Sequence, residues 1–342
     1  MKEQVPGFGL QVSEESLSSN ILDKWRGLFV GELKRVDGII LAITENEAAL
    51  IPQIVQHILA SGGKRLRPVL TILSGKLCGY EGSRHVQLAA AIELLHTATL
   101  LHDDVVDESK LRRGVDTANN VWGNAASVLV GDYLLGKAFQ LMARDGSIKV
   151  LEILSDASSV ITEGEVKQLM AAGDITTTQE AYTDIIARKT AQLFAAACRV
   201  GAVVAERPEA EERALESFGR YLGVAFQIAD DALDYSATQE RLGKTIGDDF
   251  REGKVTLPVI LAYARGDAAE KLFWERVIGG EQREGDLARA VEYIQRHNAL
   301  PDTMGCAREY AGKAAAALEI FPVSEIKTAL LELLEFSVSR PY

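Results

Sequence analysis

The stretch RHVQLAAAIELLHTATLLHDDVVDE, residues 84–108, is the clearest indication of the fold class. Its apolar residues recur with the spacing of an α-helix, and neither glycine nor proline interrupts it. The same periodicity runs along most of the chain, whereas period-2 alternation joined by hairpin turns is not found. We therefore predict no sheet, and helices over 20–43, 48–61, 65–78, 84–108, 118–144, 147–172, 178–204, 208–235 and 254–265, with shorter ones between 268 and 337.

The predicted helices are separated by short breaks, such as Gly79–Gly82 and Gly243–Gly253. No break is long or low in complexity enough to be an interdomain linker, and no repeat of a solenoid appears. The chain has 342 residues, 47% of them hydrophobic, which is enough to bury a large core. We predict a polar segment over 1–20, followed by a single all-α domain over 21–342 with about ten or more helices.

Composition excludes several classes of protein. A net charge of −12 argues against a general nucleic-acid binder. The three cysteines (Cys78, Cys198 and Cys306) lie far apart and form neither a disulfide framework nor a zinc site, as expected in a reducing cytoplasm. The N-terminus lacks the apolar core of a signal peptide, and no apolar run is long enough to span a bilayer. We expect a soluble, cytoplasmic protein that can touch a membrane surface.

Residues 118–172 are rich in Ala, Val, Leu and Ser and carry few charges. A helix on the surface of a monomer should have a polar face. Helices that are apolar on most sides lie in a bundle centre or in a subunit interface. We predict both for this segment, and hence a homodimer.

Two acidic clusters of equal spacing each end a long apolar helix. They comprise Asp103, Asp104 and Asp107, and Asp230, Asp231 and Asp234. The outer carboxylates of each cluster are four residues apart, so they share one helix face. Carboxylates near a helix C-terminus oppose the helix dipole and repel one another, and a hard cation such as magnesium would compensate this cost. Two facing clusters could hold a diphosphate between metal ions, whereas one such cluster alone could be a solvated helix end.

Cations accompany these clusters. Lys64, Arg65 and Arg67 follow the glycine pair at 62–63 and open a predicted helix, a setting that favours anions. The remaining cations are Arg112 and Arg113 after the first cluster, Lys189 beside Thr190, and Lys244 and Lys254 around the break at 243–253. Each alone could be a surface cation, but a site for two diphosphates next to magnesium would use them all.

The motifs GGKRLRP (62–68), LLHDDVVDESKLRRG (100–114), GDYLL (131–135), FQIADDALDY (226–235) and GKTIGDDFREGKVTLP (243–258) resemble, in order and spacing, those of trans-isoprenyl diphosphate synthases. The resemblance runs from about residue 25 to the C-terminus. It implies an all-α fold, usually dimeric, with both acidic motifs at the mouth of a central cavity.

The resemblance also implies roles for single residues. Asp103, Asp107 and Asp230 would hold two or three magnesium ions, assisted by Asp104, Asp231 and Asp234. Isopentenyl diphosphate would be bound by Lys64, Arg67, His96 and Arg113. The allylic diphosphate would be held by Arg112, Lys189, Thr190, Gln227 and Lys244, with Lys254 near the leaving group.

The implied reaction begins with heterolysis of an allylic C–O bond. Magnesium and the cations would stabilise the charge of the departing diphosphate. The residues expected to be catalytic are the six aspartates Asp103, Asp104, Asp107, Asp230, Asp231 and Asp234, together with Lys189 and Lys244. The isopentenyl double bond then attacks the allylic cation, and the released diphosphate can take the proton that is lost. A protein nucleophile is not required, so we expect His102 to serve in helix packing or in support of Asp103.

Product length should depend on the depth of the cavity below Asp103. Thr99 and Ala98 lie one helical turn deeper and are small. In the family, small residues there accompany long products, although small residues also simply allow helices to pack closely. The stretches VWGNAASVLVGDYLLGKAF (121–139) and GEVKQL (164–169) resemble bacterial octaprenyl- to decaprenyl-type synthases, which implies an insoluble long-chain product for quinone side chains.

Several alternatives share part of this pattern. A geranylgeranyl or farnesyl diphosphate synthase would differ mainly in cavity depth. A terpene cyclase would usually carry one acidic motif with an Asn/Ser/Glu metal motif and would lack the GGKRLRP site for a second diphosphate. A non-catalytic regulatory subunit would have lost aspartate or arginine positions that are present in this sequence.

Overall fold

The structure, a computed structural model, describes residues 14–45, 48–60, 65–112, 114–236 and 247–339. Within these residues it is helical almost throughout, and the predicted fold class is confirmed. The first half of the chain contains, in order, α1 (Glu14–Thr44), α2 (Leu50–Ala60), α3 (Leu66–Leu77), α4 (Arg84–Val106), β1 (Leu111–Arg112), β2 (Val115–Asp116), α5 (Ala118–Trp122), α6 (Asn124–Asp145) and α7 (Ile148–Ala171).

The second half begins with α8 (Gln179–Ile186), which continues through a π-helical turn, η1 (Ala187–Ala191), into α9 (Gln192–Val204). It goes on with α10 (Glu209–Asp234), α12 (Asp248–Arg251), α13 (Leu257–Arg265), α14 (Ala268–Ile278), α15 (Asp286–Arg296), α16 (Ala299–Ala317) and α17 (Glu325–Val338).

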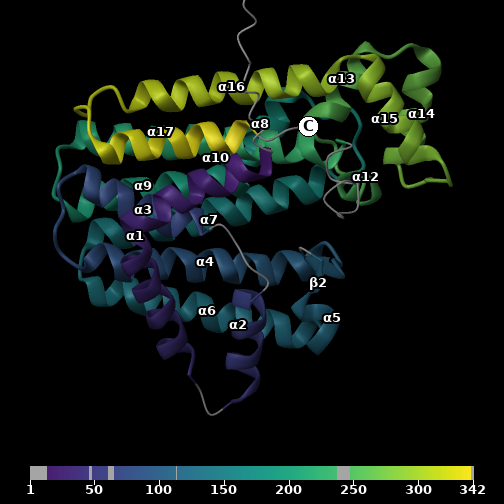
Figure 1. The fold of residues 1–342 in the computed structure, drawn as a ribbon. Coiled ribbons are helices and arrows are strands. Elements are labelled where there is room, and N and C mark those ends of the chain that lie inside the picture. The colour runs from purple at the N-terminus through teal and green to yellow at the C-terminus, as the bar shows by residue number, and fades with distance from the viewer. Residues whose placement is uncertain (1–13, 46–47, 61–64, 113, 237–246, 340–342) are drawn as a thin grey trace, which may run out of the picture.

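The helices form stacked layers that share one hydrophobic core (Figure 1). Helix α4 packs against α6, and α10 packs against both α9 and α16. The apolar periodicity of these helices explains the layers, because each buries one face against its neighbours. In Figure 1, α14 and α15 lie to one side of the main stack.

Backbone contact between α9 and α10 depends on Gly219. A β-carbon at this position would lie 2.4 Å from the carbonyl oxygen of Phe194, which is far below a normal contact. Only glycine therefore allows the two helices to approach this closely. The contact sets η1 directly beside the second half of α10, where one acidic cluster lies.

The structure corrects the predicted elements in three places. The predicted helix over 118–144 is two helices, because Gly123 adopts φ 85° between α5 and α6. The predicted helix over 178–204 contains the π-helical turn η1. The prediction of no sheet is wrong locally, because β1 and β2 pair antiparallel, Leu111 with Asp116 and Arg112 with Val115. Two-residue strands are too short to give a recognisable alternation.

The α6–α7 layer exposes an unusual number of large apolar side chains. Leu129 is 68% exposed and Met170 is 79% exposed. The others along these two helices are Val128, Phe139, Ile148, Val166 and Leu169. This agrees with the few charges between 118 and 172, and it identifies the outer surface of the layer as apolar. Among the described residues, no helix combines the length and apolarity that crossing a bilayer requires.

Candidate active site

The first acidic cluster lies where α4 ends. Asp103 is in the last turn of α4, and Asp107 caps it, with its amide donating to the Asp103 carbonyl at 2.8 Å. The helix cannot continue because Glu108 adopts the left-handed φ of 51°. Asp104 points the other way and is 4% exposed. It accepts hydrogen bonds from Arg112 Nη2 at 2.7 Å and from Arg112 Nε at 3.0 Å.

Asp103 sits in an environment that disfavours its charge. Burial, and then the carboxylate of Glu165, raise the pKa of Asp103 to about 7, against the opposing effect of Lys189. Glu165 on α7 accepts a hydrogen bond from Lys189 Nζ at 2.7 Å. The end of α4 thus faces a second carboxylate and a lysine from the layer above.

The second acidic cluster lies where α10 ends. Asp231 is 5% exposed and accepts hydrogen bonds from the Tyr182 hydroxyl at 2.6 Å and from Gln227 Nε2 at 2.7 Å. Burial raises the pKa of Asp231 to about 7 despite these two donors. Burial likewise raises the pKa of Asp234 to about 6, although it accepts the amide of Asp249 at 3.1 Å. Asp230 is exposed on the same turn.

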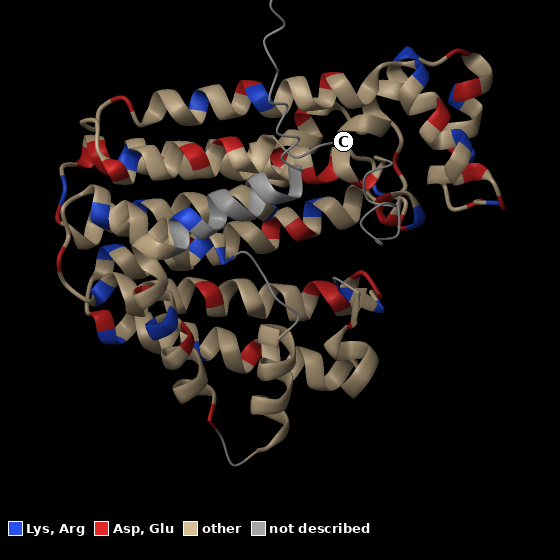
Figure 2. Ribbon diagram, in the orientation of Figure 1, with Lys and Arg blue, Asp and Glu red and all other residues tan. Residues whose placement is uncertain are grey.

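Lys254 connects the two clusters. Its Nζ lies 3.1 Å from Asp107 Oδ2 and 2.5 Å from Glu252 Oε2. Its amide donates to the carbonyl of Asp249, whose own amide binds Asp234. Burial opposes the charge of Lys254, but the surrounding carboxylates outweigh it and raise its pKa. Lys254 is therefore linked to the end of α4 through its side chain, and to the end of α10 through its backbone and Asp249. Figure 2 shows acidic positions at the end of α4 and beside α12.

A cavity of about 130 Å³ opens beside this lysine. Its walls come from the ends of α7 and α10, from α8 and η1, and from the segment after α12. Five of the residues predicted to act on the allylic diphosphate or its metals line it, namely Lys189, Thr190, Gln227, Asp231 and Lys254. The Thr190 hydroxyl donates to Gln227 Oε1 at 2.9 Å. π-helical turns often mark functional positions, and η1 here presents Lys189 and Thr190 to the cavity.

Part of the predicted isopentenyl diphosphate site lies between α3 and α4. Arg67 Nη1 and His96 Nε2 are 3.0 Å apart, and the Arg67 guanidinium lies 4.5 Å from the centre of the Phe194 ring. Three other predicted residues, Lys64, Arg113 and Lys244, lie outside the described part of the chain.

The residues predicted to set product length lie on α4 as expected from the helical spacing. Ala98 is 2% exposed, and Thr99 is half-buried with its hydroxyl bound to the His96 carbonyl at 2.8 Å. His102 packs against Gly131 of α6, where a β-carbon would lie 2.3 Å from the ring. Its Nε2 is 3.2 Å from the Val128 carbonyl oxygen, a contact that suits helix packing.

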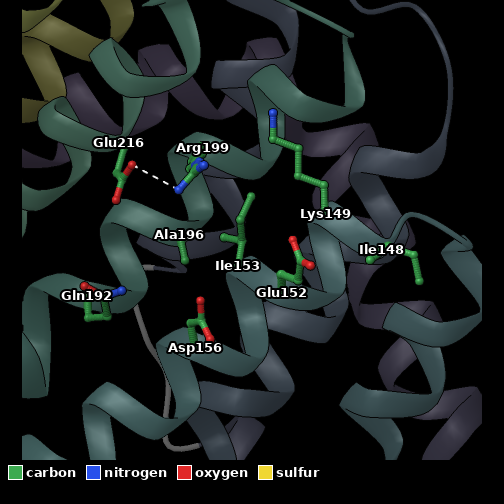
Figure 3. Close-up of a pocket in the computed structure, with 9 residues that line it drawn as sticks. All are labelled: Ile148, Lys149, Glu152, Ile153, Asp156, Gln192, Ala196, Arg199 and Glu216. Carbon is green, nitrogen blue, oxygen red and sulfur yellow. Dashed lines mark hydrogen bonds and ion pairs between the residues drawn. The ribbon is translucent and has the colours of Figure 1, made fainter. Parts of the chain in front are cut away.

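A larger cavity of about 540 Å³ lies elsewhere, between α7, α9 and α10 (Figure 3). None of the predicted site residues lines it. Its cations already pair with glutamates, since Arg199 lies 3.2 Å from Glu216 and Lys149 lies 2.6 Å from Glu212. It therefore lacks the surplus of positive charge that a diphosphate requires.

Sequence reasoning missed several residues of the site. Asp249 stands in the quoted motif GKTIGDDFREGKVTLP and could have been singled out there; burial, Asp231 and Asp234 raise its pKa well above the ordinary value. Tyr182 gave no local signal, because its partner Asp231 is distant in sequence. Glu165 stands in the quoted stretch GEVKQL, but no local pattern indicates its contact with Lys189. Glu93, which pairs with Arg65, was hidden within the apolar run of α4.

The donor set fits a divalent cation. Carboxylates of raised pKa lie at both helix ends, Asp103 on α4 and Asp231 on α10, and a bound cation would favour their charged forms. Within the part of the chain that the structure describes, no three carboxylate, histidine or cysteine side chains converge into a ready-made metal site. The donors at the two helix ends are carboxylate oxygens, which are the ligands that magnesium prefers.

Comparison with known proteins agrees with this chemistry. Residues 48–294 match the model of the polyprenyl synthetase family. The octaprenyl diphosphate synthase of Haemophilus influenzae is 45% identical over 94% of this chain and 98% of its own length.

Solved structures agree as well. The decaprenyl diphosphate synthase of Rhodobacter capsulatus has a TM-score of 0.89 and 46% identity, covering 93% of this chain and 98% of its own. A polyprenyl synthase of Caulobacter crescentus, solved with calcium and isoprenyl diphosphate, has a TM-score of 0.90 and 50% identity over the same shares of each chain. Both the family match and these relatives cover well over half of the sequence, and the chain therefore belongs to the polyprenyl synthetase family.

Proposed function

We propose that this enzyme condenses an allylic diphosphate with isopentenyl diphosphate in successive head-to-tail steps and releases a long all-trans polyprenyl diphosphate of octaprenyl to decaprenyl length. The observation that carries the proposal is that Lys254 is linked to both acidic helix ends and lines a cavity together with Lys189, Thr190 and Asp231. The similarity to octaprenyl and decaprenyl diphosphate synthases supports the long product.

In this proposal Asp103, Asp107 and Asp230 hold two or three magnesium ions. Asp104 and Asp231 assist indirectly, since the first is bound by Arg112 and the second by Tyr182. When bound, magnesium would neutralise negative charge on the leaving diphosphate. The chain's own contribution is to hold the carboxylates in place, because Tyr182 and Gln227 donate to Asp231 and backbone amides donate to Asp234.

Lys189, Thr190 and Gln227 bind the allylic diphosphate from the cavity wall, and Lys254 faces its leaving group. Arg112 and Lys244 complete this set. The allylic C–O bond breaks, and both of its electrons leave with the diphosphate, where fixed cations stabilise the charge. Arg67 and His96, with Lys64 and Arg113, hold isopentenyl diphosphate so that its double bond forms the new C–C bond. The proton lost afterwards passes to the released diphosphate.

The growing chain descends past Ala98 and Thr99. Small side chains on this wall of α4 leave room that an aromatic ring would fill. We propose use of the product in quinone side chains, and release at a membrane surface, because a chain of this length is insoluble in water. The enzyme itself acts in the cytoplasm as one domain over 21–342 that follows the polar segment 1–20.

We further propose that the enzyme is a homodimer through the apolar outer surface of α6 and α7. Exposed apolar patches of this kind on a globular protein usually mark an interface. Leu129, Phe139 and Met170 are among the side chains that a second copy would cover.

The product assay tests the proposal. Purified protein is incubated with magnesium, farnesyl diphosphate and labelled isopentenyl diphosphate, and the dephosphorylated products are separated by thin-layer chromatography. We expect long polyprenols of eight to ten isoprene units, the length named in the proposal. Products that stop at four units, one more than the primer, would favour a shorter-chain synthase. Recovery of unreacted substrates alone would contradict the enzymatic function.

A further inference from the structure

Arg65 adopts an unusual backbone conformation at the start of α3. Its φ of 49° and ψ of 35° are left-handed, which disfavours every residue except glycine. Strained backbone persists where surrounding contacts hold it, and the contacts of the Arg65 side chain supply such a restraint.

That side chain is tethered to two helices. Its Nη1 donates to Glu93 Oε1 of α4, and its Nη2 lies 3.3 Å from Asp37 Oδ1 of α1. Glu93 is 6% exposed, whereas Asp37 is nearly half exposed, so the bond to Glu93 is the one shielded from water. Loss of the arginine would leave the Glu93 carboxylate buried without a counter-ion, which costs free energy of folding. The Arg65–Glu93 pair is therefore a strong restraint between the start of α3 and α4.

The Arg65–Glu93 ion pair lies close in sequence to two residues assigned to isopentenyl diphosphate, Arg67 and His96. Arg67 lies two residues beyond Arg65, and its Nη1 is 3.0 Å from His96 Nε2. His96 in turn lies three residues beyond Glu93 on the same face of α4. The Arg65–Glu93 bond therefore fixes the start of α3 against the turn of α4 that carries His96.

We propose that Arg65 and Glu93 are positioning residues for the isopentenyl diphosphate site. Their ion pair holds the left-handed turn before α3, and so aims Arg67 at the diphosphate alongside His96, without either residue touching the substrate. The inference rests on the proposed roles of Arg67 and His96, and it goes beyond them by assigning a function to a pair outside the substrate contacts.

The variant Arg65→Gly removes the ion pair to Glu93 but leaves the left-handed backbone conformation accessible. Glycine adopts φ 49° freely, so this variant relieves the backbone strain while removing the guanidinium. Glu93→Gln keeps the shape of the other partner and removes its charge. We expect each variant to raise the KM for isopentenyl diphosphate about tenfold, with kcat and the KM for the allylic diphosphate within about twofold of wild type. Because both act through one contact, the double variant should raise the KM no more than either single variant.

Asp145→Asn provides a matched control. Asp145 is also a shielded carboxylate paired with an arginine, since it accepts from Arg84 Nε and Nη2 at 2.8 Å each, and Arg84 opens the same helix α4 at its far end. This control should lower the melting temperature and leave both KM values unchanged. Melting temperatures of all variants then separate lost stability from lost positioning.

Two outcomes would overturn the inference. It is wrong if Arg65→Gly and Glu93→Gln leave the KM for isopentenyl diphosphate within about twofold of wild type, or if they raise both KM values alike. Arg67→Ala distinguishes this failure from that of the underlying site. If Arg67→Ala raises the KM for isopentenyl diphosphate and the Arg65 and Glu93 variants do not, only the positioning role fails. If Arg67→Ala has no effect either, the proposed substrate site and the inference fail together.

Discussion

At the residue scale, the environment of Asp103 disfavours its charged form, so a nearby cation would stabilise the site. The raised pKa of Asp103, about 7, means that the folded, metal-free protein holds a proton there that the unfolded chain loses near pH 4. Between about pH 4 and pH 7 the folded state therefore binds more protons than the unfolded state, and this carboxyl makes folding less favourable as pH rises through that window. Asp231, with a pKa of about 7, acts in the same direction.

The first prediction follows from the direction of this change in stability with pH. Without metal, Asp103→Asn should be more stable than wild type at pH 8, where Asp103 is ionised, and the difference should vanish below about pH 4, where this carboxyl is protonated in both states. Added magnesium should stabilise wild type more at pH 8 than at pH 6, because the ligands must be deprotonated. Thermal unfolding across pH measures both effects. Equal stabilisation by magnesium at the two pH values would refute the assignment of Asp103 as a ligand.

The second prediction concerns Ala98. Ala98 is buried one turn before Asp103, and in the proposed function its small side chain is what admits the growing chain, so a phenyl ring there would block it. Ala98→Phe should shorten the main product while the first condensation continues, and chromatography of the dephosphorylated products reports the length. The control is Val323→Phe, at a position that is 93% exposed in the segment between α16 and α17, and its products should be unchanged. Products of wild-type length from Ala98→Phe would show that the chain does not pass this wall of α4.

At the scale of elements, the contact between α7 and η1 decides where Lys189 points. A β-carbon on Gly164 would lie 2.6 Å from the amide nitrogen of Lys189 and 2.9 Å from Cβ of Arg188. These atoms belong to the π-helical turn, so α7 can reach it only through a glycine. The same contact brings Glu165 to Lys189.

The third prediction is that Gly164→Ala displaces η1 and raises the KM for the allylic diphosphate, with a stability loss of about 1–3 kcal/mol from overpacking. Gly312→Ala on α16 is the matched control, since nothing lies within 4 Å of a β-carbon there. The control should be neutral or more stable by up to about 1 kcal/mol. Steady-state kinetics and thermal unfolding compare the two, and similar behaviour of both variants would argue against the role of Gly164.

The elements also show what sequence reasoning can reach. The acidic clusters were assigned to the ends of α4 and α10 correctly, because strong apolar periodicity locates long helices and their last turns. The π-helical turn was not predicted; it lies in contact with both α7 and α10, which are distant from it in sequence. Contacts such as Tyr182 with Asp231 and Glu165 with Lys189 join residues 49 and 24 positions apart, and no local pattern announces them.

At the scale of the whole molecule, the exposed apolar surface of α6 and α7 predicts self-association. Leu129→Glu places a charge on that surface at a side chain that is 68% exposed, so the folded subunit tolerates it while the interface does not. We expect the variant to be monomeric. Sedimentation or light scattering measures the mass, and Leu272→Glu, at a position 66% exposed on α14, is the control that should stay dimeric. A wild type that is itself monomeric would contradict the proposed interface.

The central claim is that the acidic ends of α4 and α10 act on one diphosphate through shared metal ions. A crystal structure with manganese in place of magnesium and an unreactive allylic thiodiphosphate tests it most directly, because anomalous scattering locates the metal ions. The account predicts metal ions bound by Asp103 and by Asp230, all in contact with the same diphosphate. Metal ions at only one of the two clusters, or a diphosphate bound away from Lys189 and Lys254, would contradict it.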